Sequence, residues 1–311
     1  MGGNVFAGKT ASIKAENINP TLDAYFSELK TIFPNKADIF DHQHFIALGS
    51  VGKKLVSSDI DLGVDSLDLI DKKMSNESIA TWGLDPKAVE KEFELLERRA
   101  RTATTEHLRM KAFLKTLTVY INAHAPVLFC DEKKVSNGNV FGLYPQFDQD
   151  NQQLDSNVQI DWMIGDLPWL KFSYYSTAYP EDSNVKGLHR TQLILSAFQV
   201  ANLSFNHVSG VKHKASGKII AHDPDQALAI LGENLGFNIT QTDAENYYSL
   251  HTLLKENMKP DYYNAVVNTY LKILDSTRAD IPDNLQSEWY KRRDNLGLTG
   301  KFLPESSLLK V

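Results

Sequence analysis

Alternating polar and apolar positions predict strands in the first half of the chain. In DIDLGVD, residues 59–65, the odd positions carry aspartate or glycine and the even positions carry isoleucine, leucine or valine. A period of two places the acids on one face of a strand and the apolar side chains on the other. FIAL at 45–48, VLFC at 127–130 and VQIDWMI at 158–164 are further apolar runs of strand length. The remainder of 127–150 is rich in Asn, Gly and Asp and is expected to form loops.

Apolar residues at three-to-four spacing predict helices elsewhere. Residues 20–34 form one such segment, which Pro34 ends, and residues 86–124 form a long one with a candidate break at the polar TATT of 102–105. From about residue 187 the chain is expected to be mostly helical. The elements expected there are helices at 188–203, 224–235, 242–259, 261–276 and 283–295, and a hairpin over 211–222.

Two helices of this second half carry boundary signals. Asp223-Pro224 marks a helix start and Gly236 the corresponding stop. Thr242 and Glu245 have the spacing of a capping box, which predicts the start of the helix that Pro260 closes.

These elements together predict an α+β fold in two domains. The first, residues 1–185, is expected to hold a mixed sheet with helices and a long helical insertion near 86–124. The second, residues 186–311, is expected to be mostly helical and to close a cleft over the first.

Composition narrows the setting of the protein. The chain has 311 residues, of which 42% are hydrophobic and 23% charged, so it can bury a sizeable core. The net charge of −6 argues against a protein coated along its length with nucleic acid, while leaving room for a local basic groove. Cys130 is the single cysteine, which predicts a reducing, cytoplasmic setting without an internal disulfide. No apolar run approaches the roughly 18 residues of a membrane span, so no membrane partner is expected.

The acids of residues 59–65 are the first candidate for chemistry. Asp59 and Asp61 point the same way from one strand, and two unpaired carboxylates so close together raise each other's pKa. A divalent cation removes that repulsion, and Mg²⁺ prefers such hard oxygen ligands. Upstream, Gly49-Ser50 predicts a tight turn whose backbone N–H groups and hydroxyl can meet a phosphate. Lys53 adds positive charge nearby, although a surface lysine without a ligand is an equal alternative.

This combination resembles the polymerase-β-like nucleotidyltransferase superfamily. The residues that carry the resemblance are Leu48-Gly49-Ser50 and, after a short spacer, the run SDIDLGV at 58–64. That wording is most similar to the branch of the oligoadenylate synthases and the bacterial cyclic-oligonucleotide synthases. It is also compatible with poly(A)-polymerase-like and antibiotic-modifying members. The resemblance is specific over residues 45–65 and faint elsewhere.

The resemblance implies a third carboxylate on a neighbouring strand. Asp161, between Ile160 and Trp162, is the best match, and Asp166 is the alternative. Asp59 and Asp61 would then bind both ions of a two-metal Mg²⁺ or Mn²⁺ site, and Asp161 would bind one ion and accept the proton of the attacking hydroxyl. The stretch between Asp61 and Asp161 is long for the family, and the helical segment near 86–124 fills it.

The resemblance also implies residues that bind the nucleotide. Gly49, Ser50 and Lys53 are expected at the triphosphate. In the resembled branch a basic helix start lies close to the phosphates, and Lys186 and Arg190 occupy that position here.

The implied activity is transfer of a nucleoside monophosphate from a nucleoside triphosphate to an acceptor hydroxyl, with release of pyrophosphate. ATP is the expected nucleotide, and oligonucleotide or second-messenger synthesis is one form of the reaction; the acceptor can be a nucleotide, an RNA, a protein or a small molecule. Two alternatives stay open: a nucleotide-sugar glycosyltransferase, whose DxD holds a metal on a diphosphate, and a non-catalytic nucleotide-binding regulatory protein. The first expects a nucleotide-binding α/β half before the DxD, whereas residues 1–58 look partly helical.

Overall fold

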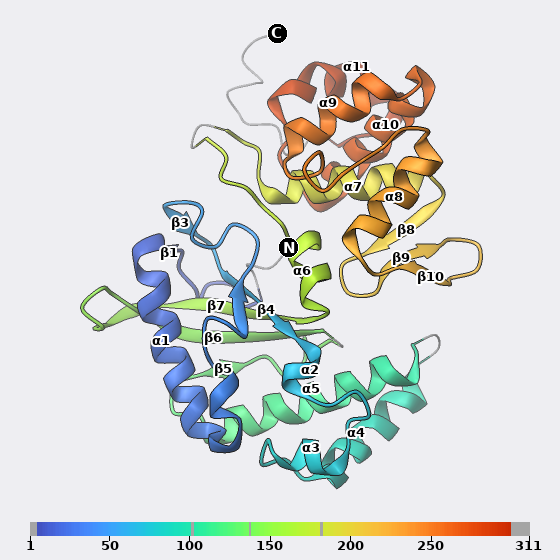
Figure 1. Ribbon diagram of the computed structural model, residues 1–311. Coiled ribbons are helices and arrows are strands. Elements are labelled where there is room, and N and C mark those ends of the chain that lie inside the picture. The colour runs from blue at the N-terminus through green and yellow to red at the C-terminus, as the bar shows by residue number, and fades with distance from the viewer. Residues whose placement is uncertain (1–4, 101–102, 137, 181–182, 300–311) are drawn as a thin grey trace. The chain divides into compact units, whose positions relative to one another are not determined.

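The computed structural model describes residues 5–100, 103–136, 138–180 and 183–299 (Figure 1). Contacts group the chain into two compact units that divide between Leu170 and Lys171. The sequence placed the domain boundary after residue 185, which is further along the chain than this division. The roles expected for the two domains stay predictions.

The first unit is α+β. Its strands are β1 Ile13–Lys14, β2 Phe45–Ala47, β3 Val56–Ser57, β4 Ile60–Asp65, β5 Phe129–Cys130, β6 Asn139–Phe147 and β7 Gln153–Gly165. Its helices are α1 Ala15–Ile32, the 3-10 helix η1 Pro34–Ile39, α2 Ser66–Leu69, α3 Asn76–Ala80, α4 Pro86–Arg99 and α5 Thr105–His124; α6 Leu167–Ser173 spans the division between the units.

Five of these strands form a mixed sheet in the order β2-β4-β7-β6-β5. β4 and β7 pair in parallel, with Asp61 directly opposite Asp161, while the other neighbours pair antiparallel. β1 and β3 form a separate two-stranded sheet. The strands predicted from FIAL, VLFC, DIDLGVD and VQIDWMI are confirmed as β2, β5, β4 and β7.

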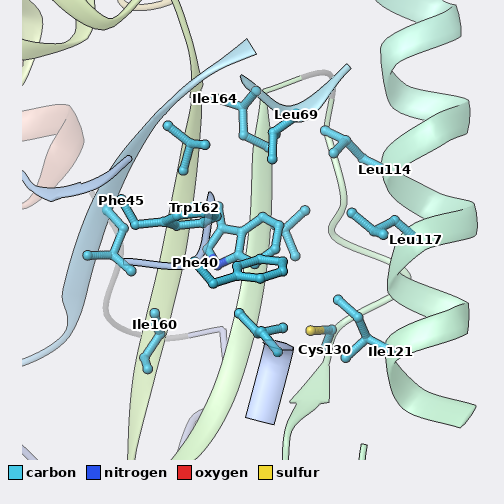
Figure 2. Packing of buried hydrophobic residues seen from close by; sticks show 14 of the residues in the cluster. Phe40, Phe45, Leu69, Leu114, Leu117, Ile121, Cys130, Ile160, Trp162 and Ile164 are labelled. Carbon is cyan, nitrogen blue, oxygen red and sulfur yellow. The ribbon is translucent and has the colours of Figure 1, made fainter. Parts of the chain in front are cut away.

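One face of the sheet carries the core of this unit. The even-numbered apolar residues of β4 and β7 are buried against α1 and α5, and Trp162 Nε1 donates a hydrogen bond of 2.7 Å to Tyr25 Oη of α1. Figure 2 shows apolar side chains of α5 pointing toward Trp162 and Ile164 of β7. Cys130 belongs to the same cluster, and its burial, with a smaller contribution from the charge of Glu132, raises the pKa of the thiol to about 12. Because side chains alternate along a strand, the opposite face is left for the acids.

Strand β6 lies where loops were expected, so that prediction was wrong. Val140, Gly142, Tyr144 and Gln146 alternate toward the interior, but Gly and Gln do not register as core positions in a sequence pattern. Gln146 is buried because its Nε2 donates to the carbonyl oxygen of Ala11 at 3.1 Å, a contact distant in sequence.

The segment predicted as a long helix with a candidate break is two helices, α4 and α5. α4 ends at Arg99 and α5 begins at Thr105, the last residue of TATT, whose first residue lies outside the described part of the chain. Thr104 caps α5 by accepting a hydrogen bond from the backbone N–H of His107 at 3.3 Å. Lys115 of α5 pairs with Glu92 of α4 and ties the two helices together.

The second unit is mostly helical, as predicted. Its helices are α7 Gly187–Val200, α8 Pro224–Leu235, α9 Tyr247–Asn257, α10 Pro260–Thr277, the 3-10 helix η2 Asp283–Leu285 and α11 Gln286–Leu296. Its strands are β8 Leu203–Asn206, β9 Gly210–His213 and β10 Ile219–Ala221, which form an antiparallel sheet in the order β10-β9-β8. The hairpin of β9 and β10 is confirmed. Leu203 begins β8 rather than ending the preceding helix, because the chain turns at Asn202 with a φ of 58°.

The helix boundaries of the second unit agree with one capping signal and not with the other. Asp223 caps α8, and Gly236 ends it with a φ of 88°. The capping box at Thr242 was wrong: α9 begins at Tyr247, after Asn246, whose side chain accepts from the backbone N–H of Ser249 at 2.9 Å. The Glu245 carboxylate instead accepts a hydrogen bond of 2.8 Å from Tyr175 Oη.

Across the described parts of the chain, no helix is both long enough and apolar enough to cross a membrane.

Gly63 of β4 gives a test of the packing beside the acids. A β-carbon at this position would lie 2.9 Å from Leu48 Cδ1 and 3.2 Å from Ile46 Cγ1, on the same face of the sheet as Asp61. We expect Gly63→Val to lower the free energy of unfolding of the first unit by about 1–3 kcal/mol, because the closely packed side chains must move. Ala47→Val, at an exposed position of β2, is the matched control and should be near neutral. Urea denaturation followed by tryptophan fluorescence measures both, and equal effects would contradict the packing argument.

Candidate metal centre

The parallel pairing of β4 and β7 brings three carboxylates together. Asp61 and Asp161 are register partners, and Asp59 lies just before β4 begins at Ile60. Ligand oxygens of the three aspartates lie within 4.8 Å of one another. The acids that the sequence suggested at positions 59, 61 and 161 therefore form one cluster.

Hydrogen bonds from the protein reach only some of the carboxylate oxygens in this cluster. Gln159 Nε2 donates to Asp161 Oδ2 at 2.8 Å, and Ser58 Oγ donates to Asp59 Oδ1 at 2.9 Å. Asp61 Oδ1 and Asp161 Oδ1 are both buried, and neither has a hydrogen-bond partner among the described residues. Buried polar oxygens without partners are rare and costly, so these two atoms point to a ligand.

The electrostatics of the cluster lead to the same conclusion. Burial, followed by the charge of Asp59, raises the pKa of Asp61 to about 7. Burial, followed by the charge of Asp61, raises the pKa of Asp161 to about 8. Three carboxylates at this separation cannot all stay ionised near neutral pH without a compensating positive charge.

A divalent cation fits this donor set. Hard cations such as Mg²⁺ bind carboxylate oxygens, and the two unpartnered oxygens and the clustered charge are what such an ion would satisfy. The acidic triad is thus compatible with a divalent metal site.

The Gly49-Ser50 turn lies directly beside Asp61. Leu48 donates its backbone N–H to the Asp61 carbonyl oxygen at 2.9 Å, and Gly49 follows with a φ of 59°. A β-carbon at Gly49 would lie 3.4 Å from Asp61 Oδ2, so a glycine suits both the left-handed backbone and the close approach to the carboxylate.

Lys53 belongs to the same turn. Its Nζ donates to the carbonyl oxygen of Gly49 at 3.1 Å, and its backbone N–H donates to Ser50 O at 3.0 Å. Burial lowers the pKa of its ammonium group. The predicted cradle residues Gly49, Ser50 and Lys53 thus form one compact turn, and their contact with a phosphate stays a prediction.

Two neighbouring aspartates have structural partners instead. Asp65, on the same face of β4, caps α2 by accepting the backbone N–H of Leu67 at 2.9 Å. Asp166, the alternative third carboxylate, accepts the backbone N–H of Trp169 at 2.9 Å, just after β7 ends at Gly165. Neither belongs to the cluster formed by Asp161 and the DxD acids.

The two basic residues expected at the phosphates lie in the second unit. Lys186 immediately precedes α7, is exposed and has its Nζ 3.4 Å from Asp280 Oδ2. Arg190 is buried; its guanidinium donates to the carbonyl oxygens of Ala244 and, at 2.8 Å, Phe172. Their role toward a nucleotide stays a prediction.

Gln159 is a residue of this site that the sequence reasoning missed. It lies two positions before Asp161 on the same face of β7 and is fully buried. A polar residue at that spacing in an apolar run was the available signal.

Comparison with known proteins does not assign the chain to a family. No protein-family model matches the chain, and neither does any curated protein. The site is therefore defined by its own geometry: an α+β fold that holds Asp59, Asp61 and Asp161 together.

The raised pKa values give the site a pH dependence. Without metal, Asp61 and Asp161 keep their protons in the folded state at pH values where the unfolded chain has released them, so their contribution to stability is full below about pH 4 and is lost as the pH rises through about 7 to 8. Mg²⁺ needs both groups as carboxylates. We expect Mg²⁺ to raise the thermal midpoint little at about pH 5.5 and clearly at about pH 8.5, where a roughly hundredfold excess over Kd adds about 2.7 kcal/mol.

Thermal unfolding with and without Mg²⁺ at both pH values measures this effect. Asp61→Asn should abolish the response, whereas Asp65→Asn, on the same strand, should keep it. A Mg²⁺ response of equal size at both pH values, or one that survives Asp61→Asn, would count against a metal at these carboxylates.

Proposed function

We propose that the chain is a metal-dependent nucleotidyltransferase of the polymerase-β-like type, which transfers a nucleoside monophosphate from a triphosphate to an acceptor hydroxyl. One observation carries the proposal: the three clustered carboxylates lie beside a glycine-serine turn that approaches Asp61. Nucleotidyl transfer needs metal ions held by carboxylates, and backbone donors that bind the phosphates. An acidic cluster beside a tight turn can supply both. The wording of residues 58–64 supports the oligoadenylate synthase and bacterial cyclic-oligonucleotide synthase branch.

The carboxylates have separate roles in this reaction. Asp59 and Asp61 would hold two Mg²⁺ or Mn²⁺ ions, and Asp161 would hold one of them. When bound, the ions supply positive charge to the phosphates and to the attacking and leaving oxygens. Asp161 accepts the proton of the acceptor hydroxyl. The hydroxyl oxygen then bonds to the α-phosphorus while the bond from that phosphorus to pyrophosphate breaks.

The turn residues bind the triphosphate. Gly49 and Ser50 offer backbone N–H groups and a hydroxyl, and Lys53 offers a positive charge from the same turn. Lys186 is the better candidate of the two basic residues in the second unit, because it is exposed while the Arg190 guanidinium is occupied by backbone carbonyls. ATP is the proposed nucleotide, and the acceptor is a nucleotide, an RNA, a protein or a small molecule.

Incubation with each α-labelled nucleoside triphosphate tests the proposal. With Mg²⁺ or Mn²⁺, alone and with cell RNA, the wild type should form labelled product and pyrophosphate. Asp59→Asn/Asp61→Asn should lower the rate by at least about 10³-fold, since both metal ligands on one strand are lost. Asp65→Asn is the matched control; it keeps a good helix-capping side chain on the same strand and should retain most of the activity.

Three outcomes would contradict this function. If the double variant still formed labelled product at the wild-type rate, Asp59 and Asp61 would not be part of the active site. Turnover of nucleotide sugars alone would favour the DxD glycosyltransferase. Binding of Mg²⁺-ATP in calorimetry, with no product from any nucleotide or acceptor, would favour a non-catalytic nucleotide-binding protein.

A further inference from the structure

Gln159 makes two hydrogen bonds that join the acidic cluster to the start of the described chain. Its Oε1 accepts the backbone N–H of Val5 at 3.0 Å, and its Nε2 donates to Asp161 Oδ2 at 2.8 Å. The backbone N–H of Val5 can only donate, so the amide oxygen must face it and the amide nitrogen must face the carboxylate. The orientation of the Gln159 amide is thus fixed from both sides.

The segment that carries Val5 is itself held by the first unit. Lys134 Nζ donates to the Val5 carbonyl oxygen at 3.2 Å, and the backbone N–H of Ala11 donates to Asn157 O of β7 at 2.8 Å. Phe6 is buried edge-on against Phe129 of β5, with ring centroids 6.1 Å apart. Contacts of Val5 itself and of the residues that follow it therefore keep its N–H aimed at Gln159.

We propose that Gln159 is a positioning residue that turns the Asp161 carboxylate for metal binding, and that residues 5–11 act as the brace for Gln159. The hydrogen bond from Gln159 occupies Asp161 Oδ2 and leaves Oδ1, which is buried and has no partner among the described residues, as the oxygen that faces an ion. The inference rests on the proposed metal site and adds to it a support that lies far away in sequence.

This arrangement follows a general property of metal sites. A ligand side chain that can rotate loses affinity, and hydrogen bonds from the surrounding shell fix it at the productive angle. Asp161 has a single side-chain donor in the described structure, and that donor is Gln159. Without it, the carboxylate could present either oxygen, or could rotate away from Asp59 and Asp61.

Mn²⁺ binding, measured by the electron paramagnetic resonance signal of the free ion, tests the inference without any substrate. Gln159→Leu removes the amide at nearly constant volume and should raise the Kd for Mn²⁺ about 10- to 100-fold. Thr118→Val is the control: Thr118 is also fully buried in the first unit, but its hydroxyl donates to the backbone carbonyl of Leu114 and, within the described structure, is hydrogen-bonded neither to an acid nor to residues 5–11. Its Kd should stay within about twofold of the wild type.

Val5→Pro tests the brace without touching β7. Proline lacks the backbone N–H that Gln159 accepts, so the Kd for Mn²⁺ should rise about tenfold, toward the Gln159→Leu value. The double variant should then be no weaker than Gln159→Leu alone, because both changes remove the same support.

The outcomes separate this inference from the proposed site. A wild type that binds no Mn²⁺ would remove the site and the inference with it. Wild-type binding with unchanged affinity in Gln159→Leu, or equal losses in Gln159→Leu and Thr118→Val, would overturn the inference alone. If Gln159→Leu does not fold, Val5→Pro decides: unchanged affinity overturns the inference, and a tenfold loss supports it.

Discussion

The parallel pairing of β4 with β7 is the constraint on which the site depends. It sets Asp61 opposite Asp161, and a shift of one residue in that register would turn Asp161 toward α1 and α5, into the apolar core. The register is held from the core side, because Trp162 packs among the helices and is hydrogen-bonded to Tyr25. The hydrophobic face of the sheet therefore determines the geometry of the acids on the other face.

The same pairing explains why the third acid is so distant in sequence. Parallel neighbours need a long connection, and here it contains α2 to α5 together with β5 and β6. β6 then lies on the far side of β7, so that β7 is covered by a strand on each edge. An enclosed strand of this kind can bury Asp161 where an edge strand would expose it. Burial makes the carboxylate costly for the folded protein and receptive to an ion.

Local patterns revealed much of this structure, and contacts distant in sequence supplied the rest. The alternation in DIDLGVD was enough to predict β4 and to suggest that the carboxylates of Asp59 and Asp61 lie close together. Asp161 was suggested only through a family resemblance, since no local rule relates one strand to another so far along the chain. β6 was missed because Gly142 and Gln146 owe their burial to neighbours rather than to hydrophobicity. The orientation of the Gln159 amide could not be predicted, because Val5, which fixes it, lies 154 residues away.

The single thiol of the chain has a practical consequence. Cys130 is buried in the hydrophobic core of the first unit. Its thiol is almost wholly protonated at neutral pH, because burial raises its pKa. Alkylating reagents attack the thiolate, so they will find this position unreactive in the folded protein. A spin label or fluorophore attached to one introduced surface cysteine will consequently report from that site alone, with the native cysteine left in place.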